Sequence, residues 1–170
     1  MTRVYISMGS NIEREHNIRA GLAALREHYG ALIVSSVYDS KAVGFAGDDF
    51  YNLVVGFDAA EDVYTVAHTL ERIEHEHGRA RGAARFNSRT LDLDLLLCDD
   101  LVLREPGLKL PRPDILKYAF VLWPLAEIAG QLRHPQDGRT YQEMWQRFDK
   151  GPQKLVRVDF PVDLDAAVNG

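Results

Sequence analysis

The chain has 170 residues, of which 46% are hydrophobic and 26% charged, and its formal net charge is −5. This composition supplies a buried core and excludes a fibrous or disordered chain. The acidic balance excludes broad electrostatic binding of nucleic acid, although a local basic site remains compatible with it. At ~150 residues per domain, the length predicts one domain over residues 1–170.

Cysteine usage and hydropathy indicate the compartment. The single cysteine, Cys98, cannot form an internal disulfide or a cysteine-rich zinc site. The longest apolar run, over 120–126, is broken by Pro124 and is shorter than the ~18 residues that span a bilayer. The N-terminus lacks the apolar core of a signal peptide. We therefore expect a cytoplasmic monomer without a membrane or nucleic-acid partner.

Hydrophobic periodicity predicts the first half of the fold. Alternating apolar residues predict a strand over 3–8 that ends in a turn at Gly9-Ser10-Asn11. Apolar residues at helical spacing predict a helix over 18–29, which Gly30 ends. Residues 31–38 are rich in β-branched and aromatic types and predict a second strand.

The second half begins with a predicted strand over 50–57. A helix follows with Asp58 as its N-cap, and Gly78 closes it. The remaining predicted elements are a strand over 90–98, a short strand over 101–103 after the turn Asp99-Asp100, helical structure from Pro113 to Ala129, a helix over 141–148 and an edge strand over 156–160. The order β-α-β-β-α-β is the split βαβ pattern. It predicts an α+β fold, a ferredoxin-like α/β sandwich whose mostly antiparallel sheet has helices packed on one face.

Two aspartates alternate with leucines in the segment Thr90-Leu91-Asp92-Leu93-Asp94-Leu95. Because residues i and i+2 of a strand share a face, Asp92 and Asp94 lie side by side and repel each other unless a cation lies between them. Carboxylates without a neighbouring His or Cys suit a hard cation such as Mg²⁺, and two bridged ions are a known arrangement for phosphoryl transfer. The alternative is a solvent-facing strand with alternating charge.

Four arginines lead into this aspartate pair: Arg79, Arg81, Arg85 and Arg89. A guanidinium group matches the oxygens of a phosphate. A solvated basic loop is the alternative for each arginine alone, but beside two carboxylates the four predict a site for a polyphosphate with Mg²⁺. The chain has neither a Walker A sequence nor a dinucleotide-binding fingerprint.

Three further features need an interpretation, and the first two have two each. Phe50 and Asn52 share one strand face and would form a wall of a pocket for a planar heterocycle, or else are a core aromatic and a strand-edge amide. The run Glu74-His75-Glu76-His77 has the residue types of a transition-metal site, but neighbouring helix positions diverge by ~100°, which favours a solvated helix end. Cys98 ends an apolar strand as a small core residue.

The motifs SMGSN, FYNLVV, RIEHEHGRARGAARFNSRTLDLDLLL and FVLWPLAEIA occur in the order and spacing of one enzyme family. The chain resembles the 6-hydroxymethyl-7,8-dihydropterin pyrophosphokinases from about Val4 to about Ala129. The resemblance implies a ferredoxin-like fold and a folate-pathway activity. In that reaction the β,γ-diphosphate of ATP passes to the hydroxymethyl group of the pterin, and AMP is released.

The resemblance also implies roles for individual residues. Asp92 and Asp94 match the aspartates that hold two Mg²⁺ ions, and with Arg79 and Arg89 they are the expected catalytic residues. The expected contacts to ATP are Arg79, Arg81, Arg85, Arg89 and Arg112. The expected contacts to the pterin are Val43, Phe50, Asn52, Glu74 and Phe120, with the two phenylalanines on either side of the ring.

The chain departs from the family pattern at several positions of the expected site. Asn87-Ser88 replaces a usual Gly-Pro, Phe86 a tryptophan, and Ser40-Lys41-Ala42-Val43-Gly44 a Thr-x-Pro-x-Gly loop. Arg112 replaces a histidine, and Tyr118 replaces an arginine two residues before Phe120. These departures leave a second hypothesis, a pterin- or nucleotide-binding paralogue that has lost catalysis. A ferredoxin-like RNA-binding module is a third, but acids occupy its key strand.

Overall fold

The computed structural model describes residues 1–40, 50–77, 91–151, 153 and 155–160. Its elements are β1 (Thr2–Ser10), α1 (Arg14–Tyr29), β2 (Ile33–Val34), β3 (Val37–Ser40), β4 (Phe50–Ala59), α2 (Val63–Glu76), β5 (Asp92–Cys98), β6 (Leu103–Glu105), β7 (Leu108–Leu110), the 3₁₀ helix η1 (Pro113–Leu116), α3 (Ala119–Ala129), α4 (Tyr141–Gln146) and β8 (Leu155–Val158).

The main sheet confirms the predicted ferredoxin-like topology. Its strand order is β5-β1-β4-β3-β8, with β2 also paired to β4, and each of the pairings between its described strands is antiparallel. The two central strands, β1 and β4, pair along nine residues of β1, from Thr2 to Ser10. A second, two-stranded sheet joins β6 to β7, a strand that the periodicity did not predict. The polar positions on β5, β1 and β4 therefore lie in adjacent rows of one sheet.

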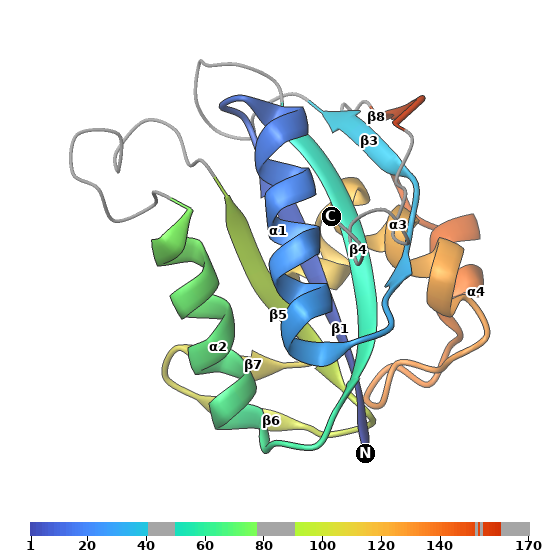
Figure 1. Cartoon of the computed structure of the whole chain (residues 1–170). Helices are drawn as coiled ribbons and strands as arrows, with labels where there is room; N and C mark the ends of the chain where they lie inside the picture. Colours follow the sequence, from blue (N-terminus) through green and yellow to red (C-terminus); the bar gives the residue numbers. More distant parts are fainter. Residues whose placement is uncertain (41–49, 78–90, 152, 154, 161–170) are drawn as a thin grey trace.

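Helices cover both faces of the main sheet, so the prediction of one covered face was wrong (Figure 1). On one face, α1 and α2 bury Ile18, Leu22 and Ile73 against the side chains of Ile6 and Leu53. On the other face, α3 and α4 pack against the sheet in a second core cluster. The strands can bury both faces because positions between the alternating apolar residues, such as Tyr5, Val54 and Leu96, are also buried.

Tertiary contacts moved several predicted boundaries. Gly9 and Ser10 continue β1 instead of forming a turn, because β4 pairs with both residues. The N-cap of α2 is Asp62, whose Oδ1 accepts the N–H of Thr65 at 2.8 Å. The predicted cap, Asp58, lies in β4 and pairs with Arg3 at 2.7 Å. Gly30 ends α1 as predicted, with a positive φ of 84°, whereas Gly78 lies outside the described residues.

Helix α3 is fixed to the sheet by one carboxylate. Glu127 accepts hydrogen bonds from the backbone N–H and the hydroxyl of Ser36, and from the hydroxyl of Tyr38 at 2.7 Å. The ring of Trp123, one turn earlier, packs on Tyr38 with 4.5 Å between the ring centroids. Because these contacts hold the middle of α3 against β3, they also set the position of its N-terminus.

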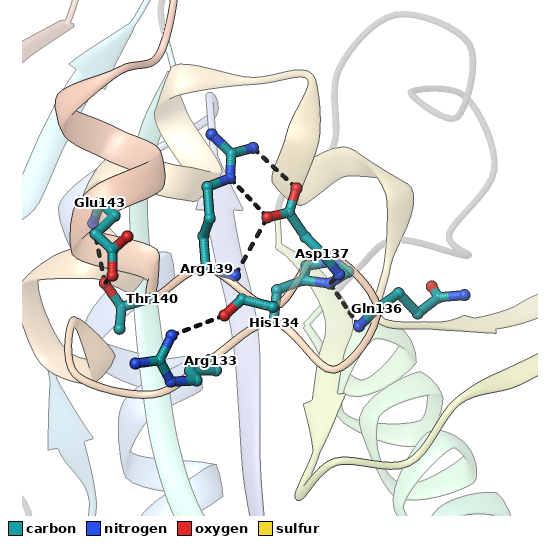
Figure 2. Close-up of polar contacts among 8 residues, drawn as sticks. Arg133, His134, Gln136, Asp137, Arg139, Thr140 and Glu143 are labelled. Carbon is teal, nitrogen blue, oxygen red and sulfur yellow. Dashed lines mark hydrogen bonds and ion pairs between the residues drawn. The ribbon is translucent and has the colours of Figure 1, made fainter.

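Polar contacts around His134 hold together the loop that connects α3 and α4 (Figure 2). The buried His134 accepts the backbone N–H groups of Gln136 and Asp137 on Nδ1, at 3.1 and 3.0 Å. The guanidinium group of Arg139 donates to Asp137, and this ion pair lowers the pKa of the Asp137 carboxyl to about 2. The loop is therefore a fixed structure that depends on a neutral imidazole.

The structure also tests the predictions about Cys98 and about a membrane-spanning segment. Cys98 is buried in the core, as predicted, and burial raises the pKa of its thiol to about 11. None of the helices that the structure describes is long and apolar enough to cross a membrane.

Candidate active site

The aspartate pair lies at the start of β5, on the face of the sheet that α3 and α4 cover. Leu93 and Leu95 point into the core beneath α1 and α2, so the intervening Asp92 and Asp94 point to the opposite face. Both aspartates are half-buried. The prediction that they share one face is confirmed, and at this spacing their charges need a cationic neighbour.

A glycine separates the aspartates from the predicted heterocycle-binding amide. In the sheet, Asp92 is opposite Gly9 of β1, and Gly9 is opposite Asn52 of β4. A Cβ atom at Gly9 would lie 2.9 Å from Oδ1 of Asn52, which is closer than side chains normally pack. Gly9 therefore leaves open the space between a carboxylate and an amide. This glycine belongs to the motif SMGSN, in which it was predicted only as part of a turn.

Asn52 is held in one orientation by a neighbouring strand. Its side chain is 7% exposed, and Nδ2 donates to the hydroxyl of Ser40 at 2.6 Å. Phe50, on the same face of β4, comes within 3.6 Å of the position of a Cβ at Gly9. Phe50, Asn52 and Asp92 thus surround one glycine. The orienting role of Ser40 was not predicted, because it depends on the pairing of β3 with β4.

Arg112 supplies a cation next to the aspartate pair. Its backbone N–H donates to the carbonyl of Leu96 at 3.0 Å, which holds the residue against the outer edge of β5. Its Nη2 lies 3.6 Å from Oδ1 of Asp94, and its Nε lies 3.3 Å from Oδ2 of Asp114. Arg112 is therefore between two carboxylates, one on β5 and one in η1.

Glu74 of helix α2 also holds β5 in place. This residue of α2 is 2% exposed, and its Oε2 accepts the backbone N–H of Leu93 at 2.8 Å. Because β5 is the edge strand of the sheet, that N–H would otherwise face outward without a strand partner. The geometry of this bond supports a role in positioning the strand between Asp92 and Asp94.

Phe120 projects from the first turn of α3 and is stacked on an aromatic neighbour. Tyr118 and Phe120 are parallel to within 23°, with 5.0 Å between their ring centroids. The side chain of Gln153 accepts the N–H of Ala119 at 2.7 Å and donates to the carbonyl of Lys117 at 3.1 Å, so it caps the start of this helix. The residue that replaces the usual arginine therefore covers a face of Phe120.

Several predicted site residues lie outside the described part of the chain. They are Val43, Arg79, Arg81, Arg85 and Arg89, together with the departures at Lys41, Ala42, Phe86, Asn87 and Ser88.

The side chains of the run Glu74-His75-Glu76-His77, at the end of α2, do not share one set of partners. His75 and Glu76 are exposed, Glu76 pairs with Arg72 at 3.2 Å, and Nδ1 of His77 lies 2.7 Å from the carbonyl of Ile73. In the part of the chain that the structure covers, no three His, Cys, Asp or Glu residues are grouped to hold a metal ion. His75 and Glu76 therefore lie at a solvated helix end, as predicted, whereas Glu74 is buried.

Comparison with known proteins gives close sequence relatives. The chain is 39% identical over 146 residues to the 2-amino-4-hydroxy-6-hydroxymethyldihydropteridine pyrophosphokinase of Pseudomonas aeruginosa, which covers 84% of this chain and 89% of that protein. It is 36% identical over 144 residues to the protein of the same name from Bacillus subtilis, covering 82% and 86% of the two chains. The protein of that name from Haemophilus influenzae is 34% identical over 163 residues, covering 94% and 99%.

A solved structure shares the fold at low sequence identity. A crystal structure of a triple mutant of Plasmodium falciparum HPPK-DHPS superposes with a TM-score of 0.70 at 12% identity. The similar region covers 86% of this chain and 43% of that longer chain. At this identity the likeness shows the fold alone.

The topology and the polar row across its central strands define an α+β protein with a ferredoxin-like sheet and a candidate site at the start of β5. The sequence profile described as 7,8-dihydro-6-hydroxymethylpterin-pyrophosphokinase (HPPK) matches residues 5–130. With this match and the identities above, the chain belongs to the HPPK family.

Proposed function

We propose that this chain transfers diphosphate from ATP to 6-hydroxymethyl-7,8-dihydropterin, giving AMP and the pterin diphosphate, as a step in folate biosynthesis. Membership of the HPPK family and the names of its relatives support this reaction. The observation that carries the proposal is the row Asp92, Gly9 and Asn52, which places a carboxylate and an amide on either side of an open position.

The reaction needs positioning more than a nucleophilic side chain. The hydroxyl oxygen of the pterin forms a bond to the β-phosphorus, and the bond from that phosphorus to the oxygen of the α-phosphate breaks, so that AMP leaves. Phosphoryl-type transfer of this kind proceeds in line and depends on charge stabilisation around the phosphates. On this proposal Arg112 and the loop arginines Arg79, Arg81, Arg85 and Arg89 bind the triphosphate, with Arg79 and Arg89 acting in the transfer.

The donor set fits Mg²⁺. Asp92 and Asp94 offer two carboxylates on one face, and Mg²⁺ in nucleotide sites is held by one or two carboxylates while water and phosphate oxygens supply its other ligands. The two-carboxylate set therefore needs no third protein ligand. When bound, the ions would neutralise charge on the phosphate oxygens. Glu74, through Leu93, would hold both aspartates in place.

The pterin would lie over Gly9. Asn52, oriented by Ser40, would form hydrogen bonds to the edge of the heterocycle, and the rings of Phe50 and Phe120 would lie on its faces. For Phe120 this requires the ring of Tyr118 to move or to be the outer layer of the stack. Val43 would add a backbone contact, and Glu74 would act through the strand instead of touching the ring.

The remaining proposals concern the setting of the protein. We propose a cytoplasmic, monomeric enzyme that acts as one domain over residues 1–170 on small molecules and has no nucleic-acid or membrane partner. The formal net charge of −5 supports the exclusion of a nucleic-acid partner.

The test is AMP formation from ATP and Mg²⁺, with and without 6-hydroxymethyl-7,8-dihydropterin. The proposed function predicts that AMP appears only when the pterin is present, in equal amount to the pterin diphosphate. Binding of both ligands by calorimetry without release of AMP would instead identify the paralogue that has lost catalysis.

A further inference from the structure

We propose that Arg112 is a built-in competitor of the metal ions: its guanidinium group neutralises Asp94 when no ion is bound and turns to the triphosphate when ions and nucleotide bind. The inference rests on the proposed function, because it takes Asp92 and Asp94 as the metal-binding carboxylates. It adds a property of this chain, a protein cation that weakens metal binding in the absence of nucleotide.

The backbone of Arg112 cannot move away from the site without breaking a hydrogen bond to β5. Its N–H donates to Leu96 in β5, and η1 begins at the next residue, Pro113. The side chain therefore starts from a fixed point on the edge of the strand that carries Asp94. From there Nη2 comes to 3.6 Å of Oδ1 of Asp94, so a divalent ion on that carboxylate would be close to a like charge.

The guanidinium group is attracted to its partners without being locked to them. The separation of 3.6 Å from Asp94 exceeds that of a hydrogen bond. Nε is buried and makes no hydrogen bond to the residues that the structure describes, although Asp114 is 3.3 Å away. Since a buried donor without an acceptor is unfavourable, Arg112 has donors to offer to an anion.

A phosphate oxygen can replace Asp94 as the partner of Arg112. It is an acceptor for the guanidinium donors and carries the negative charge that Asp94 provides in the ligand-free protein. A nucleotide bound with its ions therefore gives Arg112 a new partner at the moment when Asp94 is taken by the metal. Metal binding and nucleotide binding become mutually dependent, and by linkage each strengthens the other.

The proposal predicts opposite effects on two ligands. Arg112→Gln removes the charge while keeping a shorter polar side chain. We expect it to bind Mn²⁺ without nucleotide about 2- to 5-fold more tightly than the original chain, which corresponds to the worth of a half-exposed ion pair. We expect the same variant to bind a non-hydrolysable ATP analogue with Mg²⁺ more weakly.

The experiment is a Mn²⁺ titration followed by electron paramagnetic resonance, paired with calorimetry of the ATP analogue. Arg112→Lys keeps the charge and should bind Mn²⁺ like the original chain. Arg104→Gln removes an exposed cation from β6, at the far end of the molecule from the start of β5 (Figure 1), and controls for net charge. Thermal unfolding in EDTA checks that each variant is folded.

Two results would overturn the proposal. One is unchanged or weaker Mn²⁺ binding by folded Arg112→Gln; the other is equal tightening in Arg112→Lys or Arg104→Gln. A failure of the proposed function is a separate result: it is the absence of pterin-dependent AMP release by the original chain, and tighter Mn²⁺ binding by Arg112→Gln would stand beside it.

Discussion

The carboxylate of Glu74 accepts the backbone N–H of Leu93 at 2.8 Å, so helix α2 holds the strand segment that lies between the two aspartates. The bond is buried, and the N–H of Leu93 would be unfavourable there without an acceptor. Because Leu93 separates Asp92 from Asp94, any shift of this N–H moves both carboxylates.

Replacing Glu74 by alanine should therefore lower the stability of the protein. We expect Glu74→Ala to lower the free energy of unfolding by about 2–3 kcal/mol, because the N–H of Leu93 loses its acceptor in a buried place. Glu74→Gln keeps an acceptor oxygen and should lose less. Urea unfolding measures the stability of both variants. Equal stability of Glu74→Ala and the exposed-site control Glu71→Ala would contradict this role.

The aspartates can be tested without disturbing the core. Asp92→Ala and Asp94→Ala should each reduce Mg²⁺-dependent transfer by on the order of 10³-fold, since several phosphate oxygens would lose charge neutralisation. Both side chains are half-buried and carry no core packing, so the fold should be retained. Asp100→Ala, at the exposed turn after β5, is the matched control. Near-normal turnover in the double variant Asp92→Ala/Asp94→Ala would exclude a metal-binding role for the pair.

Variants of Asn52 and Ser40 test two different roles: Asn52 would bind the pterin, and Ser40 would orient Asn52. Asn52→Ala should weaken pterin binding by about 1–3 kcal/mol because the heterocycle loses its hydrogen-bonding partner. Binding of an ATP analogue should change little. Ser40→Ala leaves the amide in place but removes its acceptor at 2.6 Å, so a smaller loss of pterin affinity is expected. Calorimetry that shows equal losses for pterin and ATP analogue would mean that Asn52 is structural.

Gly9 gives a steric test of the same pocket. Gly9→Ala would place a methyl group 2.9 Å from Oδ1 of Asn52, and the amide or β1 must shift to accept it. We expect pterin affinity to fall at least as much as in Ser40→Ala, with metal binding at Asp92 less affected. Unaltered pterin affinity in folded Gly9→Ala would place the pterin elsewhere.

His134 predicts a pH dependence of stability. Burial lowers the pKa of its imidazole below the ordinary value, so the native state favours the neutral form that accepts two backbone N–H groups. The nearby Asp137 opposes this shift, and Arg139 adds to it. Below about pH 6.5 the unfolded chain binds a proton at this histidine that the native chain resists. Stability from this group is therefore complete above pH 6.5 and falls as the pH drops toward the lowered pKa.

Unfolding in urea at several pH values measures this effect. Between about pH 7 and pH 5 the original chain should lose stability through His134, because its native-state pKa is lowered. His134→Gln should start from lower stability and show a flatter pH profile, whereas His68→Gln, at an exposed position on α2, should keep the original slope. Identical slopes for the original chain and His134→Gln would refute the link.

Features that depend on neighbouring residues could be predicted from the sequence. The period of two in β5 was enough to place Asp92 and Asp94 on one face, and the β-α-β-β-α-β order was enough to predict the ferredoxin-like sheet. Gly30 ended α1 as expected because a positive φ is a local property. Cys98 was also assigned correctly, since an apolar strand buries its small residues.

Features that join residues far apart in the chain could not be predicted in this way. The turn expected at Gly9 became part of β1 because β4 pairs with it, and this pairing puts Gly9 between Asp92 and Asn52. Coverage of both sheet faces depends on where α3 and α4 pack, which strand periodicity does not encode. The contacts of Glu74 with Leu93 and of Arg112 with Asp94 join residues 19 and 18 positions apart. No local pattern specifies such contacts, because only the packing of α2 and η1 against the edge of β5 brings those atoms together.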